Sequence, residues 1–294
     1  MTSLDDLPPI RQLTPADLTA CLDLAEENAW EREQHRWRLL LTSGHGYGID
    51  APAGDRAGGL VAVVIRTSYA DQWHAVGMML VAPRRQRQGL GQRMMRRVIE
   101  DAAGAPVLLT ATDQGRGLYE RLGFKAVGGI TTVRGTFVPP PEAPEAAGAA
   151  GVTVRPATAA DLPAILAYDR PAFGADRTEL LARLPSFADR FLVAEEPGGR
   201  LVGYGAAWPN VTSTSIGPLV ADDPAVARAL LIPLALDTPT RARFDVGDWH
   251  PELAAWLAER GLVEAARTDL MIHGAAQPPG DLERRFAPFS MAHG

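Results

Sequence analysis

Two glycines flanked by basic and amide residues lie between an apolar run and an amphipathic segment. The apolar run, 76–81, leads into the pattern Gln86-x-x-Gly89-x-Gly91. Apolar residues after the glycines recur at helical spacing, so the glycines fall at a strand-to-helix junction. Glycine allows a close backbone approach to a ligand, and the first turn of a helix offers unpaired N–H groups that favour an anion. This stretch therefore predicts a phosphate-binding loop.

Arginines surround these glycines in a chain that is acidic overall. The formal net charge is −6 and the sequence pI is about 5.6. Positive charge gathered at one loop of an acidic chain favours a phosphorylated ligand there. The overall acidity argues against a nucleic-acid partner and is compatible with a cationic substrate. The arginines are Arg84, Arg85, Arg87, Arg93, Arg96 and Arg97.

A second pattern follows after a predicted strand at 106–112. Residues 118–124 read LYERLGF. In this order, the two patterns resemble the acyl-CoA pyrophosphate loop and the L-Y-x-x-x-G-F segment of the GNAT N-acetyltransferase superfamily. The resemblance implies acetyl-CoA as co-substrate, no metal, and transfer of an acetyl group to a primary amine of a small molecule or peptide. It is specific over about residues 10–137 and looser over 152–274.

The resemblance also assigns binding roles. The backbone of the strand before the loop would bind the pantetheine arm, and an amide at Met79 or Leu80 would polarise the thioester carbonyl. The loop would bind the pyrophosphate, and Arg84, Arg85 or Arg87 is a candidate for the 3′-phosphate. The expected acetyl-CoA-binding residues are Met79, Leu80, Val81, Gln86, Arg87, Gln88, Gly89, Leu90, Gly91, Gln92 and Thr112.

Tyr119 is the expected catalytic residue. A phenol with a pKa near 10 is protonated at neutral pH and can donate its proton to a departing thiolate. The alternative is a tyrosine packed for its ring alone. The general base stays open, because the predicted strand 73–81 holds no carboxylate, so water or an amine that arrives neutral could replace a base. The side chains considered near the acceptor are Glu26, Glu27, Glu31, His35, Asp71 and His74.

A length of 294 residues indicates about two domains. A stretch rich in proline, alanine and glycine, 139–151, is the predicted linker between an N-terminal GNAT domain, 1–138, and a C-terminal domain with its tail, 152–294. Residues 152–162 repeat the pattern of 10–18, which indicates tandem duplication. We expect an α/β fold with a mixed α+β sheet: two tandem GNAT-like domains, each a mostly antiparallel twisted sheet flanked by helices.

The second copy departs from the first where the phosphate loop would be. It reads Ala-Asp-Asp-Pro at 221–224, and two carboxylates there would repel a phosphate. We interpret this half as one that keeps the fold and has lost acyl-CoA binding, a layout that resembles a bacterial GNAT subgroup with a degenerate C-terminal domain. Phe173, Asp176 and Arg177 either face the acceptor cleft or only pack the interface between the domains. Phe286 and Phe289 in the tail are candidates to pack on the body.

Composition limits the remaining possibilities. The single cysteine, Cys21, excludes an intramolecular disulfide and fits a packing role. The absence of a secretory signal and of a long apolar run predicts a cytoplasmic protein with no membrane partner. A homodimer stays open. Two alternative functions also stay open: an aminoglycoside-type resistance acetyltransferase, and an acyl-CoA-binding sensor or scaffold without turnover.

Overall fold

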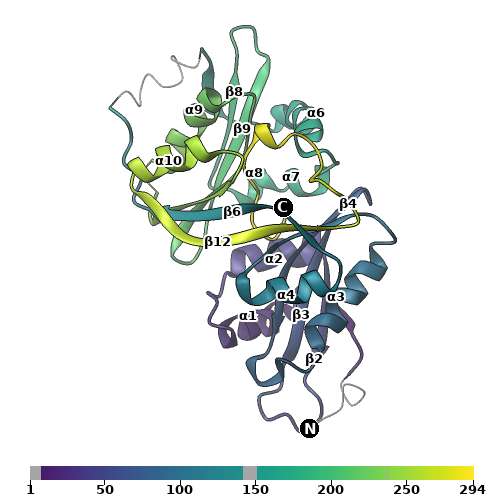
Figure 1. Ribbon diagram of the computed structural model, residues 1–294. Helices are drawn as coiled ribbons and strands as arrows, with labels where there is room; N and C mark the ends of the chain where they lie inside the picture. The colour runs from purple at the N-terminus through teal and green to yellow at the C-terminus, as the bar shows by residue number, and fades with distance from the viewer. Residues whose placement is uncertain (1–7, 142–150, 237) are drawn as a thin grey trace. The chain divides into compact units, whose positions relative to one another are not determined.

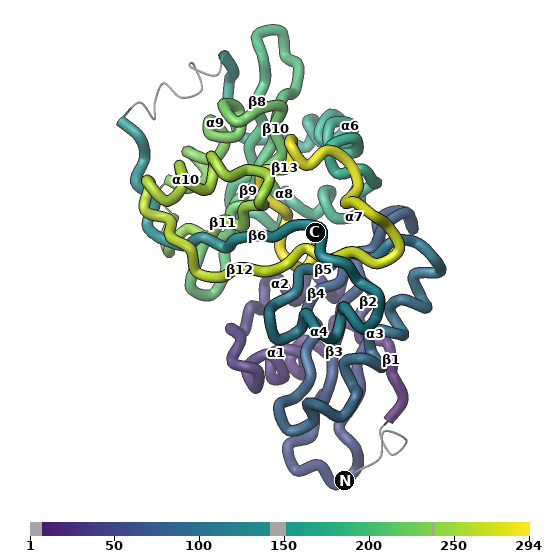
Figure 2. Tube along the Cα trace, viewed as in Figure 1, coloured from purple at the N-terminus to yellow at the C-terminus, as the bar shows by residue number. Residues whose placement is uncertain are grey.

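The computed structural model describes residues 8–141, 151–236 and 238–294, and the chain forms two compact units (Figures 1 and 2). Most of the predicted linker, 139–151, lies outside the described residues. Unit 1 comprises Met1–Ala126, Met271–Ala276 and Ala292–Gly294. Unit 2 comprises Val127–Leu270 and Gln277–Met291. Each unit therefore takes in residues from both predicted domains.

Unit 1 is a sheet with helices packed against it. Its elements are β1 (Arg11–Leu13), η2 (Pro15–Asp17), α1 (Leu18–Glu27), α2 (Gln34–Ser43), β2 (His45–Asp50), β3 (Leu60–Tyr69), β4 (Trp73–Val81), η3 (Pro83–Arg85), α3 (Leu90–Asp101), β5 (Val107–Ala111) and α4 (Asp113–Arg121). Strands β1 to β4 are antiparallel neighbours in chain order, and β5 joins β4 in parallel. One core cluster joins the buried faces of α1, α2 and α3 to β3, whose residues 61–65 are fully buried.

Unit 2 repeats this order. Its elements are β6 (Lys125–Gly135), β7 (Thr153–Pro156), η5 (Ala159–Asp161), α6 (Leu162–Phe173), α7 (Thr178–Leu181), α8 (Leu184–Phe187), β8 (Arg190–Glu195), β9 (Leu201–Pro209), β10 (Ser213–Ala221), α9 (Pro224–Ala235), β11 (Arg241–Gly247), α10 (Pro251–Glu259), β12 (Leu262–His273), η6 (Leu282–Arg284) and β13 (Arg285–Ala287). Strands β7 to β10 are antiparallel neighbours, and β11 joins β10 in parallel. The mixed, mostly antiparallel sheets with flanking helices confirm the expected fold class.

Local geometry repeats between the units. Thr14 and Asp17 form a capping box before α1, and Thr158 and Asp161 form the same box before α6. In each unit an arginine on the preceding strand binds the capping carboxylate. The Nη2–Oδ1 distance is 2.7 Å both for Arg11 with Asp17 and for Arg155 with Asp161. This correspondence supports the tandem duplication inferred from the sequence pattern.

The last long strand of each half completes the other unit. β6 pairs antiparallel with β11, with Ile130 opposite Gly247 and Gly135 opposite Ala242. The end of β12, from Met271 onward, belongs to unit 1, and β12 is the neighbour of β5 in the sheet. Met271 is fully buried in the core of unit 1. Because each core includes a strand from the other half of the sequence, neither half contains a complete unit.

Burial bears out two smaller predictions, a packing role for Cys21 and a tail that packs on the body. Cys21 is fully buried, and burial raises the pKa of its thiol to about 12, which fits a packing role. Phe286 and Phe289 in the tail are buried within unit 2. Phe173 and Arg177 are also buried in unit 2, with the guanidinium carbon of Arg177 4.0 Å from the centre of the phenylalanine ring, so they pack its interior.

Among the described residues, no helix is long and apolar enough to cross a membrane.

Candidate active site

Strand β4 carries a bulge just before the glycine loop. Gly77 pairs with Ile65 and Leu80 pairs with Val63, so two residues of β4 face one residue of β3. Met78, one of the two, has a positive φ of 54°. The parallel pairing with β5 ends at Val76, before the bulge. The backbone of β4 after the bulge therefore lies beyond its register with β5, where a ligand could pair with it.

The loop after β4 leads into the N-terminus of α3. Gly89 is the N-cap residue, with φ at 82° and no side-chain cap. Arg87, two residues earlier, also has a positive φ, of 60°. The N–H of Arg93 is bonded to the carbonyl of Gly89 at 3.0 Å, so the first turn leaves the N–H groups of residues 90–92 without intrahelical acceptors. These donors and the helix dipole make a site for an anion.

Gly91 is the point where the loop, β4 and α4 meet. A Cβ at this position would lie 3.0 Å from Cδ2 of Leu118 and 3.6 Å from Cε of Met79. The Cγ2 atom of Val81 is 4.0 Å away. The structure thus brings together the predicted residues of the strand end and of the loop. A methyl group at Gly91 would require the side chain of Leu118 to shift by a few tenths of an ångström.

Tyr119 and Thr112 come together on α4. A Cβ at Gly115 would lie 3.1 Å from Cε2 of Tyr119 and 3.7 Å from Oγ1 of Thr112. Thr112 is the exposed N-cap residue of α4, and Tyr119 is buried about two turns further on, with its ring edge-on to Phe124. Burial raises the pKa of Tyr119 to about 12. Within the described residues its hydroxyl makes no hydrogen bond, so the donor is available to a ligand.

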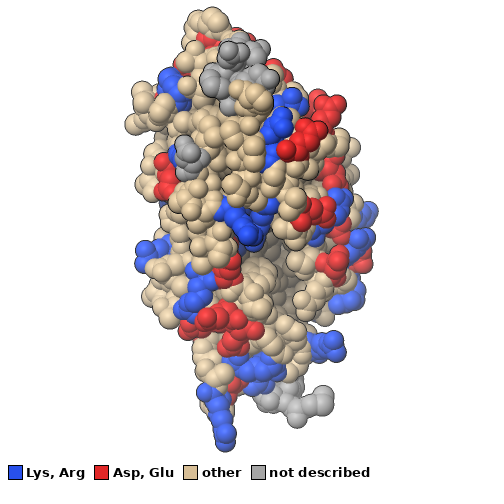
Figure 3. Space-filling view, turned by 90° about the vertical axis from the view of Figure 1, so that its left-hand side faces the viewer, with Lys and Arg blue, Asp and Glu red and all other residues tan. Residues whose placement is uncertain are grey.

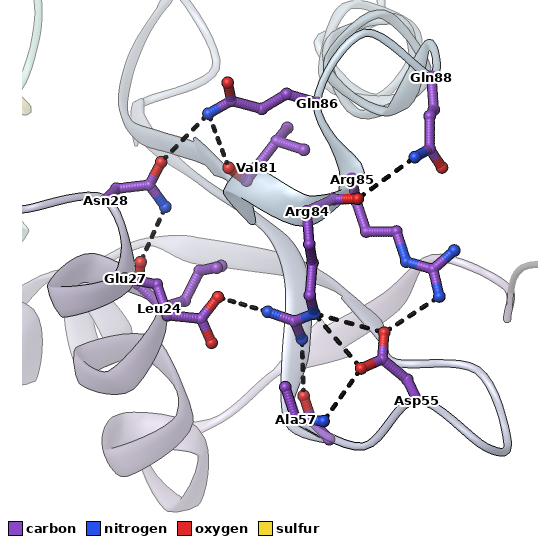
Figure 4. A network of polar contacts seen from close by, with 11 residues as sticks. Leu24, Glu27, Asn28, Asp55, Ala57, Val81, Arg84, Arg85, Gln86 and Gln88 are labelled. Carbon is purple, nitrogen blue, oxygen red and sulfur yellow. Dashed lines mark hydrogen bonds and ion pairs between the residues drawn. The ribbon is translucent and has the colours of Figure 1, made fainter.

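Arg84 and Arg85 are committed to carboxylates of unit 1 (Figure 4). Arg84 pairs with Glu27 of α1 and donates to the carbonyl of Gly58 at 3.0 Å, while Arg85 donates to Asp55 at 3.0 Å. The hydrogen bond from Arg85 is the main cause that lowers the pKa of Asp55. These two arginines therefore hold the turn after β4 in place. The sequence contained no signal for Asp55 as their partner, because it lies in an irregular turn.

Other loop residues differ in their surroundings. Gln86 donates to the carbonyl of Val81 at 3.4 Å and also faces Asn28 (Figure 4). It therefore links the end of β4 to the end of α1. Arg87 is exposed and makes no ion pair with the residues that the structure describes. Of the three arginines considered for a 3′-phosphate, it is the one left with a free guanidinium.

The base candidates are mostly held by other groups. His74 is 1% exposed, and its pKa is lowered by burial and by the charge of Arg66, so it is a neutral interior side chain. Glu26 is bound by Arg32 at 2.8 Å, and Glu27 is bound by Arg84. Asp71 accepts a hydrogen bond from Ser68 at 2.8 Å. Each of these four groups therefore has a partner or a buried position within unit 1.

Unit 2 keeps the bulge but changes its chemistry. Ile216 pairs with Ala207 and Leu219 pairs with Gly205, so Gly217 and Pro218 face one residue of β9. They therefore stand at the positions that Met78 and Met79 occupy in unit 1. Proline has no backbone N–H, so the donor available at Met79 has no counterpart at Pro218.

Unit 2 also fills the two places that would receive a ligand. At the N-terminus of α9, Oδ1 of Asp223 accepts the N–H groups of Ala225 at 2.8 Å and Val226 at 2.9 Å. Beyond the bulge, β13 pairs with β10, with Ala287 opposite Leu219 and Arg285 opposite Val220. The tail strand thus lies along the part of β10 that continues past its pairing with β11. The sequence predicted that Asp223 repels a phosphate at this place. The structure adds a specific reason, because this carboxylate already caps the N-terminus of α9.

The surface carries charges of both signs. On the face shown in Figure 3, basic and acidic side chains are intermixed, and no broad basic surface covers that face. Many of the arginines on the described residues form ion pairs with nearby carboxylates, as Arg97 does with Asp101 at 2.9 Å. Such mixing fits the low overall charge and gives no support to a nucleic-acid partner. Among the described residues, no group of histidines, cysteines and carboxylates is arranged to hold a metal.

Comparison with known families matches both halves of the chain. Two models, each described as an acetyltransferase (GNAT) domain, match residues 51–126 and 165–287. An N-acetyltransferase of Bacillus subtilis strain 168, YitH, described as uncharacterized, is 25% identical over 293 residues, covering 99% of this chain and 96% of YitH. The matches reach both units and include the loop and the bulge of unit 1.

Solved structures share the fold over nearly the whole chain. A Pyrococcus horikoshii protein named as an acetyltransferase superposes with a TM-score of 0.79 at 21% identity, covering 99% of this chain and 97% of its own. A tandem GNAT protein from the clavulanic acid biosynthesis pathway superposes with a TM-score of 0.63 at 13% identity, covering 92% and 99%. At these identities the likeness concerns the fold alone. Two domains of one type in tandem are the shared arrangement.

Proposed function

Since this chain belongs to the GNAT family of acetyltransferases, with two such domains in tandem, we propose that unit 1 transfers an acetyl group from acetyl-CoA to a primary amine of a small molecule or peptide. The observation that carries the proposal is the uncapped N-terminus of α3 beside the bulged end of β4. A helix start without a side-chain cap suits a pyrophosphate, and a strand end beyond its pairing register suits a pantetheine arm.

The residues of the loop would hold the phosphates. The N–H groups of Leu90, Gly91 and Gln92 lack intrahelical acceptors, and the positive φ of Gly89 lets the loop turn its N–H groups toward one point. Gln88 lies in the same exposed loop. Arg87 is the candidate for the 3′-phosphate, because Arg84 and Arg85 are bound to carboxylates.

The strand and α4 would serve the reacting groups. The backbone of Met79, Leu80 and Val81 would bind the pantetheine arm, and the N–H at the bulge would polarise the thioester carbonyl. The thioester supplies an activated acetyl group: the amine nitrogen forms a bond to the carbonyl carbon, the carbon–sulfur bond breaks, and the sulfur leaves as a thiolate. The buried hydroxyl of Tyr119 would give its proton to that sulfur, and Thr112 would bind the arm nearby.

The amine must lose a proton during the transfer. Glu26 and Glu27 of α1 are bound to arginines, and β4 holds no carboxylate. We therefore assign the removal of that proton to water, or to an amine that arrives neutral. The lack of a carboxylate on β4 also leaves one alternative function open, an acyl-CoA-binding sensor without turnover. The two functions differ in one observable, the release of free CoA thiol in the presence of an amine.

Unit 2 would bind no acyl-CoA. Pro218 offers no N–H at the bulge, Asp223 caps the helix N-terminus, and β13 lies along β10. Each feature removes one of the interactions proposed for unit 1. The chain is therefore expected to take up one acetyl-CoA, and unit 2 would contribute to stability or to the acceptor side rather than to binding of the donor.

Calorimetric titration of acetyl-CoA tests this proposal. The wild type should bind one equivalent, and Gly89→Glu should bind none, because it places a carboxylate at the anion site. Gly104→Glu is the matched control: Gly104 has a positive φ of 89°, against 82° for Gly89, and nothing lies within 4 Å of its added Cβ. This control carries the same charge and the same backbone strain, and it should bind like the wild type.

The outcomes separate the alternatives. No heat with the wild type would overturn the acyl-CoA assignment, and two equivalents would overturn the assignment for unit 2. Equal loss in both glutamate variants would show that strain rather than position matters. If binding behaves as expected, a panel of amines with thiol detection follows. Thiol release with any amine supports the transferase, and binding without release from a broad panel would support the sensor.

A further inference from the structure

Unit 1 contains a polar cavity at the end of α3 opposite to the glycine loop. Its volume is about 280 Å³. Helix α3 has 12 residues, so its two ends are about 18 Å apart at 1.5 Å per residue. The cavity is thus separate from the proposed acetyl-CoA site. It is lined by Ile10, Arg11, Gln12, His45, Tyr47, Arg66, Arg97 and Asp101.

The strand register explains why these polar side chains share one wall. Gln12 of β1 pairs with Tyr47 of β2, and His45 of β2 pairs with Arg66 of β3. Directly paired residues project on the same face of a sheet, and so do residues two apart along a strand. The four side chains therefore lie on one face. The last turn of α3 lines the same cavity through Arg97 and Asp101.

Most charges around the cavity are already balanced. Arg11 is bound by Asp17 and by Asp50, both at 2.7 Å. Arg97 is bound by Asp101 at 2.9 Å, and the same carboxylate accepts the hydroxyl of Tyr47 at 2.8 Å. These groups therefore present little net positive charge to a ligand.

Arg66 is the exception. It is 7% exposed, and it makes no ion pair with a carboxylate within the described residues. Its Nη1 donates to Nδ1 of His74 at 3.1 Å, and its buried Nε has no partner in the part of the chain that the structure describes. His74 is held neutral by burial and by this arginine, so it offers no compensating charge. Asp101 lies close enough to Arg66 for their charges to interact, but its carboxylate accepts its hydrogen bonds from Arg97 and Tyr47.

A buried guanidinium without a carboxylate is costly, because the charge loses its hydration. The cost falls if an anion enters the cavity and accepts hydrogen bonds from the part of the Arg66 guanidinium that lines it. The guanidinium fork matches a planar carboxylate, which can accept two parallel hydrogen bonds from it. Among the described residues that line the cavity, Arg66 is the arginine without a carboxylate partner, so one negative charge suffices to pair with it. A dianion would bring a second negative charge close to the carboxylates of Asp101 and Asp50.

We propose that this cavity binds a small monocarboxylate through Arg66, independently of acetyl-CoA. A volume of about 280 Å³ corresponds to roughly nine water molecules at 30 Å³ each, which is the room that a ligand of about nine non-hydrogen atoms takes. The Gln12 amide and the exposed His45 lie at the same wall and suit a ligand with a hydroxyl or keto group beside its carboxylate. The ligand class is a short hydroxy or keto acid.

Calorimetric titration of the full chain with lactate, acetate and inorganic phosphate, in a buffer free of carboxylates, tests the assignment. Lactate should bind in the millimolar range and more tightly than phosphate. Arg66→Met should weaken lactate binding about tenfold or more, because a charge-assisted bond is lost. Arg38→Met, an exposed arginine of α2, removes the same charge away from the cavity and should leave the affinity unchanged.

Because Arg66 is buried, its replacement can impair folding. A second variant therefore tests the cavity independently. Gln12 is exposed at the rim, so Gln12→Trp should fill the cavity and abolish lactate binding without disturbing the core. Circular dichroism decides which variants are folded. The proposal is overturned if the wild type takes up no lactate, if phosphate binds more tightly, or if either folded cavity variant binds lactate like the wild type. Loss of lactate binding with unchanged acetyl-CoA binding supports it and leaves the proposed function untouched.

Discussion

The carboxylate of Asp223 accepts the backbone N–H of Val226 at 2.9 Å, so helix α9 carries its own anion at its N-terminus. The corresponding residue before α3 is Gly89, which has no side chain to offer. In both helices the N-cap carbonyl accepts the N–H four residues on, at 3.0 Å from Arg93 to Gly89 and at 3.0 Å from Ala227 to Asp223. The two helix starts therefore share a geometry and differ in whether their donors are used.

Replacing Asp223 by alanine should destabilise unit 2 without creating a second acyl-CoA site. Loss of an N-cap carboxylate costs about 1 kcal/mol. Binding should not appear, because Pro218 and β13 still obstruct the bulge and strand. Urea denaturation should show a lower midpoint, and calorimetry should still give one equivalent of acetyl-CoA. A second equivalent in this variant would mean that the cap alone closes the site.

Tyr119→Phe should lower kcat by roughly a hundredfold, since a general acid contributes about that much or more. KM for acetyl-CoA should change little, because the ring packing against Phe124 is kept. The pKa of Tyr119 is raised to about 12 by burial, so the phenol stays protonated across the neutral and mildly alkaline range. The wild-type rate should accordingly show no loss below about pH 10 from this group. Steady-state kinetics by thiol release from pH 6 to pH 10 checks both the kcat of Tyr119→Phe and the pH profile of the wild type. An unchanged kcat in the variant would show that Tyr119 only packs.

Gly77→Ala should destabilise unit 1. The added Cβ would lie 2.4 Å from Cβ and 2.5 Å from Cα of Ala292, so backbone must move. Such overpacking costs about 1–3 kcal/mol. Gly128→Ala is the control, because the nearest atom to its added Cβ is 3.8 Å away, on Trp249. The thermal midpoint should fall for Gly77→Ala and stay near that of the wild type for Gly128→Ala. Equal midpoints would show that residues 292–294 can shift at little cost in free energy.

Asp161→Asn should reduce stability at pH 7 by up to about 1 kcal/mol, the value typical of exposed pairs. Arg155 is the main cause that lowers the pKa of this carboxyl, followed by the N–H of Thr158. A carboxyl whose pKa is lowered on folding stabilises the protein above its unfolded pKa of about 3.9, and that stability is lost as the pH falls further. The gap between variant and wild type in urea midpoint should therefore be full at pH 7 and shrink toward pH 3. A constant gap would assign the effect to lost hydrogen bonds instead.

Much of each fold could be predicted because the signals are local. The strand at Trp73–Val81 and the helix after Gly89 follow from apolar periodicity and from the conformational needs of glycine. The capping residues Thr14 and Thr158 likewise act within one turn. The bulge at Met78 escaped prediction, since β-branched and straight apolar side chains fill a bulged strand and a regular strand equally well.

By itself the sequence determined the order of elements, the duplication and the position of the glycine loop before α3, because neighbouring residues set periodicity, caps and turns. Only the tertiary structure decided which strands complete each unit, as β6 pairs with β11 while Met271 enters the core of unit 1. It also decided that Asp55 holds Arg85 and that β13 lies along β10. Strand pairing and ion pairing join residues far apart in the chain, and their free energy depends on burial and distance, which a linear pattern does not contain.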